Sequence, residues 1–135
     1  MPVSFTYDDG YNKDGDKGPI RRVNVSWTTD GSGDAAGTSL KINGYLLKGV
    51  TVPSDGPTDN YDIVLTDADG ADLLAGCIAG LTNRDTTDTE TVQFLLTDGA
   101  AGIAAHPVVC SAVIVTVAAA GAAKSGTLVL YYKAC

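Results

Sequence analysis

The chain is poor in glutamate, histidine and basic residues. Its 135 residues include 16 acidic and nine basic ones, for a net charge of −7, and 15 of the acids are aspartate. Helices favour glutamate over aspartate whereas turns favour aspartate, so this imbalance argues against a helical protein. The acidic balance also argues against a nucleic-acid partner, because phosphate binding needs clustered lysine and arginine.

Cysteine is scarce as well. Cys77, Cys110 and Cys135 form no CxxC pair, and with a single histidine, His106, the sequence offers no compact zinc cluster. Three thiols are compatible with one disulfide, but we expect reduced, buried cysteines, with the terminal Cys135 the most exposed.

The sequence has no long hydrophobic run. Its first ten residues lack the basic and apolar regions of a signal peptide. The most apolar stretch, 108–123, is interrupted by Ser111, Thr116 and Gly121 and falls short of the roughly 20 residues of a membrane span. We therefore expect no membrane association and folding in a cytoplasm.

What the sequence does have is a regular spacing of turns. Asp-Gly occurs six times, and between these pairs lie short runs rich in Val, Ile, Thr and Tyr. This pattern is typical of an antiparallel sandwich or barrel. The predicted strands are 2–7, 20–29, 37–43, 45–52, 60–66, 90–97, 107–117 and 126–133.

Alternation within these runs predicts which side chains are buried. Val23, Val25 and Trp27 share one face of their strand, so Trp27 is expected in the core. The same period of two predicts one buried face for Tyr61, Ile63 and Leu65, and another for Val113, Val115 and Val117.

Two segments carry other local signals. Asn43-Gly44 is the preferred pair for a two-residue type I′ turn, which predicts a hairpin over 39–48. In 69–81 the apolar residues recur at helical spacing, but two glycines weaken that pattern. A short helix of one or two turns and an irregular loop are equally compatible with this segment.

The sequence contains no complete motif for metal binding, catalysis or nucleotide binding. Residues 67–72 resemble a calcium loop, but a glycine stands in its fourth place and Ile78 in its twelfth, so an Asp-Gly turn is expected. His106 precedes Pro107, and the chain contains no GxSxG elbow and no nucleotide-binding glycine motif. We expect a loop or strand-edge histidine, no metal, no cofactor and no enzymatic activity.

Three segments carry a likeness to a known family: RRVNVSWTTD (21–30), 43–76 and GTLVLYYK (126–133). Within them, the Val-x-Val-x-Trp strand, the Pro-Thr-Asp-x-Tyr-Asp segment (57–62) and Asp-Leu-Leu-Ala-Gly (72–76) resemble the head decoration, or capsid cement, proteins of tailed bacteriophages. The resemblance implies a small β-rich protein on the capsid exterior of the virion. Its implied partners are the major capsid protein and further copies of itself, as a dimer or trimer. It supplies no catalytic residues.

The sequence thus predicts one all-β domain, a two-sheet antiparallel sandwich or jelly roll of about eight strands with at most one short helix. Residues 1–18 are expected to form an N-terminal arm and acidic loop, able to pair with a neighbour's sheet edge, and 19–135 the sandwich. The candidate interface residues are Val3, Phe5, Tyr7, Arg21, Arg22, Ile114, Leu128, Leu130, Tyr132 and Lys133. The alternative function is a tail- or surface-associated sandwich that binds a ligand such as a glycan, which would show exposed aromatic side chains.

Overall fold

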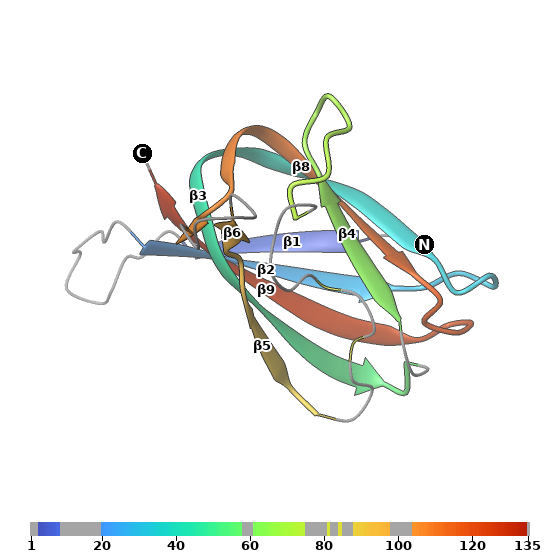
Figure 1. The fold of residues 1–135 in the computed structure, drawn as a ribbon. Helices are drawn as coiled ribbons and strands as arrows, with labels where there is room; N and C mark the ends of the chain where they lie inside the picture. Colours follow the sequence, from blue (N-terminus) through green and yellow to red (C-terminus); the bar gives the residue numbers. More distant parts are fainter. Residues whose placement is uncertain are drawn as a thin grey trace.

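The protein is all-β in the described part of the chain (Figure 1). The computed structural model describes residues 3–8, 20–57, 61–74, 81, 84, 88–97 and 104–134. The strands are β1 (Val3–Asp8), β2 (Ile20–Thr28), β3 (Ala35–Asp55), β4 (Asp62–Thr66), β5 (Glu90–Gln93), β6 (Leu96–Thr97), β7 (Ala104–Ala105), β8 (Val108–Ala118) and β9 (Ser125–Ala134).

Seven of these strands form one antiparallel sheet in the order β1-β2-β9-β3-β8-β4, with β5 added beside β3. Strands β6 and β7 form a separate pair. The predicted all-β sandwich-type fold is confirmed. The described residues contain no helix, and 75–80 of the segment with helical spacing lie outside them. No stretch among the described residues forms a helix of the length and hydropathy that a membrane crossing requires.

The 21-residue strand β3 joins the two halves of the sheet, and Figure 1 shows it curving from one half into the other. The first part of β3 pairs with β8 and the last part pairs with β9. Beyond the end of the pairing with β8, strand β5 pairs with β3 over Lys48–Thr51. The change of neighbour falls at a bulge between Leu46 and Lys48. There the Leu46 N–H donates to the Pro107 carbonyl at 2.9 Å, and the Phe94 N–H donates to the Leu47 carbonyl at 3.0 Å.

The predicted hairpin at Asn43-Gly44 is wrong, because both residues lie inside β3. Asn43 pairs with Cys110, and Gly44 pairs with residues of both β8 and β9. Ile42 and Leu46 are buried on either side of Gly44, so the alternation runs through the glycine without reversal. A glycine suits a bend where two neighbouring strands approach, and the pairing on both edges outweighs the local preference for a turn.

The core lies between the two halves of the folded sheet. Val23, Val25 and Trp27 are buried as predicted, with Trp27 only 1% exposed. The Trp27 ring packs against Tyr61, with ring centroids 5.4 Å apart and planes tilted by 48°. Gly126 lies under the indole, where an added Cβ would come within 2.5 Å of the ring. The other predicted core faces are also buried: Tyr61, Ile63, Leu65, Val113, Val115 and Val117.

Strand β1 contributes to the closure of the sheet. It pairs with β2 along its length, and an added Cβ on Gly37 of β3 would come within 2.7 Å of the Val3 Cβ. Because Gly37 has no side chain, Val3 of β1 can pack closely against the backbone of β3. Residues 3–8 of the predicted N-terminal arm therefore belong to the domain's own sheet, whereas 9–18 lie outside the described residues.

Two chain connections are joined at one end of the sheet through Thr29, which is 1% exposed. Its N–H donates to the Lys124 carbonyl at 2.8 Å, and its hydroxyl donates to the Gly121 carbonyl at 2.5 Å. The same hydroxyl accepts from the Lys124 N–H at 2.9 Å. The Ala120 N–H adds a bond to the Gly33 carbonyl at 3.2 Å. These bonds tie the β2–β3 loop to the β8–β9 turn.

Candidate interaction surface

Exposed apolar side chains concentrate in one cross-strand row. Among the described residues, three of the four large hydrophobic side chains that are exposed lie in it: Ile20 at 45%, Tyr45 at 43% and Val108 at 58%. The register places Lys133 of β9 opposite Ile20 on one side and opposite Tyr45 on the other, and Tyr45 opposite Val108. We call these four residues the exposed row; it crosses β2, β9, β3 and β8.

A second row with two cationic side chains runs beside the first on the same face. Arg22 pairs with Tyr131, which in turn pairs with Lys48. The Lys48 ammonium lies 4.7 Å from the centroid of the Tyr131 ring, within the range of a cation–π contact. The bulge in β3 sets Lys48 opposite Tyr131 and so brings its charge onto this face. Together the two rows form what we call the basic face.

The basic face is positively charged within an acidic chain. It contains Arg22, Lys48 and Lys133, and neither row contains an aspartate or glutamate on β2, β9, β3 or β8. Asp8 of β1 pairs with Arg22 at its margin. The whole chain carries a net charge of −7, so a group of three cationic side chains on neighbouring paired strands contrasts in sign with the chain's net charge.

The alternation of β9 decides which of its side chains reach this face. Tyr131 and Lys133 point outward, whereas Leu128, Leu130 and Tyr132 are in the core at 0%, 1% and 9% exposure. The prediction of these last three as interface residues is corrected, because their register opposite the inward side of β2 buries them within the chain.

Among the predicted interface residues whose side chains are described, only Arg22 and Lys133 lie together on the basic face. Arg21 lies on the opposite side of β2, in register with Tyr132. Ile114 is half-buried on β8 between β3 and β4, away from the basic face. The other three predicted residues are in β1: Val3, which packs at Gly37, and Phe5 and Tyr7, whose side chains lie outside the described part.

Most of the basic face is not predictable from the sequence. Tyr45 and Lys48 fall in the second strand of the predicted hairpin, and the sequence pattern does not mark Ile20 or Val108 as exposed. Their exposure follows from local alternation, but their proximity depends on pairing between strands far apart in the sequence. One sequence signal does indicate this face: the alternation of β9 leaves Tyr131 and Lys133 on the side opposite its buried residues.

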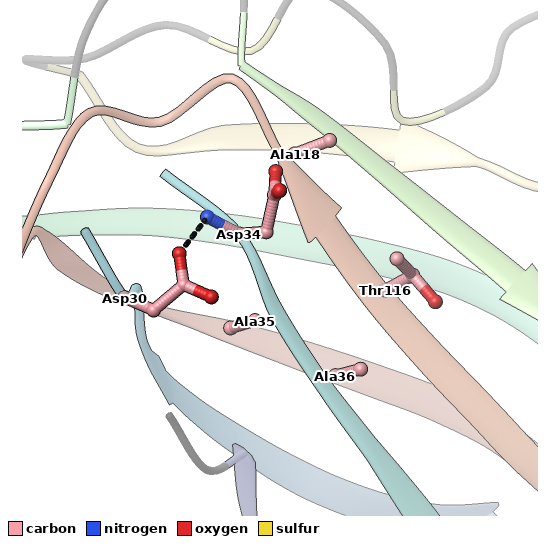
Figure 2. A pocket seen from close by; sticks show the side chains of 6 residues that line it. All are labelled: Asp30, Asp34, Ala35, Ala36, Thr116 and Ala118. Atoms are coloured by element: carbon pink, nitrogen blue, oxygen red, sulfur yellow. Dashed lines mark hydrogen bonds between the residues drawn. The ribbon is translucent and has the colours of Figure 1, made fainter. Parts of the chain in front are cut away.

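An open hollow of about 480 Å³ lies at the other end of the sheet. Figure 2 shows its lining, which consists of Asp30, Asp34, Ala35, Ala36, Thr116 and Ala118. One Asp30 carboxylate oxygen accepts from the N–H groups of Ser32 and Asp34 at 2.8 and 3.2 Å. The bonds from Asp34 and then Ser32 lower the pKa of Asp30 below its ordinary value of 3.8. This carboxylate therefore stabilises its own loop.

The remaining candidate groups also have structural roles. Asp67 accepts from the N–H groups of Asp69 and Ala71, each at 2.9 Å, which is the predicted turn at 67–72. His106 lies between β7 and β8, as predicted for a loop histidine, with Nδ1 at 2.8 Å from the Phe94 carbonyl. Within the described ranges, no group of three or more His, Cys, Asp or Glu residues is arranged to hold a metal ion.

The prediction that Cys110 is buried is wrong, because this thiol is free and exposed. On β8 Val109 and Val113 are buried, so alternation along the strand directs Cys110 outward. It lies on the same face as Val108, one cross-strand row further along β8. Cys77 and Cys135 lie outside the described residues.

Comparison with known proteins adds no relative: no protein-family model matches the chain, and no curated protein sequence matches it.

Proposed function

We propose that this protein is a structural virion protein that binds the outside of an assembled phage capsid and stabilises it. The observation that carries the proposal is the basic face. Its exposed row presents three large apolar side chains in line across four paired strands. Exposed apolar patches with a polar rim mark interaction sites, and a row fixed by strand pairing loses little conformational freedom on binding.

A capsid-binding role needs a stable scaffold and a docking face rather than reaction chemistry. The wrapped sheet provides the scaffold, and the basic face lies where β3 bends between its two halves. A protein that binds only the assembled shell raises the stability of that shell by mass action. The resemblance of 21–30, 43–76 and 126–133 to head decoration proteins supports the same role.

A glycan-binding module is the second candidate. The feature in its favour is the pair of tyrosines on the basic face, since sugars stack on exposed aromatic rings. Trp27 does not contribute to such a platform, because it is 1% exposed. Binding of oligosaccharides that is lost in a Tyr45→Ala variant, together with no binding to capsids, would favour this candidate.

The test is co-sedimentation with undecorated phage heads, assembled without this protein in the phage that encodes it. The expected result is saturable binding and a higher temperature of head rupture in the presence of the protein. A protein that never co-sediments with these heads, at low or high salt, would contradict the proposed function.

A further inference from the structure

The charge of the basic face limits what can bind to it. Lys133 is exposed at the centre of the exposed row, and Lys48 lies in the next row against the Tyr131 ring. Apolar side chains flank Lys133 on both sides, namely Ile20 and Tyr45. A partner that fits must bury apolar surface and bring negative charge to the lysines at the same time.

We infer that the basic face binds an acidic protein surface in which carboxylates stand among apolar side chains. The inference rests on the proposed function, in which that surface belongs to the outer side of the capsid. Complementary charge sets the orientation of docking and the rate of association, while the buried apolar contacts supply most of the affinity.

Two other occupants fit the face less well. In a face-to-face dimer, Lys133 and Lys48 of one copy would face the same two lysines of the other copy, and like charges across an interface are unfavourable. A nucleic acid offers a dense array of phosphates, which need more clustered lysine and arginine than the three basic residues of this face. Phosphates also offer no match for the exposed side chains of Ile20 and Val108.

The first experiment measures binding to undecorated heads by the full-length protein and by Lys133→Glu. The matched control is Lys124→Glu, which makes the same change of charge in the β8–β9 turn at the other end of the sheet. Lys133 is exposed, so its replacement leaves the fold intact, which circular dichroism verifies. We expect Lys133→Glu to raise the dissociation constant about tenfold or more and Lys124→Glu to leave it nearly unchanged.

A parallel pair tests the apolar part of the face. Tyr45→Ser removes an exposed ring from the row, while Val64→Ser removes an exposed apolar side chain from the edge strand β4. Only Tyr45→Ser should weaken binding to the heads. Raising the salt from 0.05 to 0.5 M should weaken wild-type binding and leave Lys133→Glu less affected, because salt screens charge pairs.

The second experiment uses probes in place of heads. Fluorescence anisotropy follows a labelled peptide of glutamate and leucine, the same peptide with glutamine for glutamate, and a single-stranded oligonucleotide. We expect the wild type to bind the glutamate peptide and Lys133→Glu to lose that binding. Binding of the oligonucleotide instead, or dimers of the protein alone that Lys133→Glu dissociates, would overturn the inference.

The two experiments separate this inference from the proposed function. Heads that bind wild type and Lys133→Glu equally would overturn the acidic partner while leaving capsid binding intact. Heads that bind neither, combined with a glutamate peptide that binds through Lys133, would overturn the capsid role while supporting the acidic partner.

Discussion

Thr29 offers a sharp test of how the two loops at one end of the sheet are held. In Thr29→Val a methyl group replaces the hydroxyl, leaving the Gly121 carbonyl and the Lys124 N–H without the partner they have at 2.5 and 2.9 Å. Each such bond contributes about 0.5–1.5 kcal/mol, and an orphaned buried group costs about 1–3 kcal/mol. Because Gly121 and Lys124 are half-buried, water reaches them in part, and we expect a loss of about 1–3 kcal/mol in the free energy of unfolding.

Urea denaturation followed by the fluorescence of the single tryptophan measures this loss. The control is Thr28→Val, an exposed neighbour, whose effect should stay within about 0.5 kcal/mol. Thr29→Ser keeps the hydroxyl and should retain more stability than Thr29→Val. If Thr29→Val matches Thr28→Val, or if Thr29→Ser is as unstable as Thr29→Val, the hydrogen bonds do not hold the loops together.

Three further predictions follow from other parts of the fold. Gly126→Ala brings a Cβ within 2.5 Å of the Trp27 indole, so it should cost about 1–3 kcal/mol and shift the tryptophan emission, whereas Gly31→Ala, with open space around it, should change neither. Calcium or EDTA should not move the melting temperature, because the Asp67 carboxylate is engaged with its own turn, and a shift of several degrees would contradict this. Backbone N–H groups lower the pKa of Asp30 in the folded protein. The contribution of this carboxylate to stability is therefore present above pH 3.8 and is lost as the pH falls through the pKa that Asp30 has in the folded protein. A carboxyl titration by NMR with a midpoint at or above 3.8 would refute the assignment.

Much of the fold is predictable from the sequence because its signals are local. The alternation of β2, β4 and β8 has a period of two over five or more residues, and it identifies both the strands and their buried faces. Strand β3 shows where this fails. Its Asn43-Gly44 pair favours a turn when taken alone, but pairing with β8 and β9 on both edges keeps the chain extended. Local turn propensity takes no account of the competing pairing with distant strands.

The candidate surface was much harder to predict, because it depends on register. Ile20, Tyr45, Val108 and Lys133 are far apart in the chain, and only the pairing of four strands places them in one row. The same applies to Leu128 and Leu130, whose apolar side chains predict an interface in the sequence but fill the interior of the wrapped sheet in the structure. Apolar composition identifies strands, whereas the closure of the sheet decides which face becomes surface.

The most direct test of the account is a residue-level reconstruction of phage heads decorated with this protein. The account predicts density for one wrapped β-sheet domain outside the shell, with Tyr45 and Lys133 turned toward the major capsid protein. In that complex the exposed thiol of Cys110, on the same face, should lie near the contact and react slowly with alkylating reagents. A domain bound to the head with Tyr45 and Lys133 facing solvent, and Cys110 as reactive as in the free protein, would contradict the central claim.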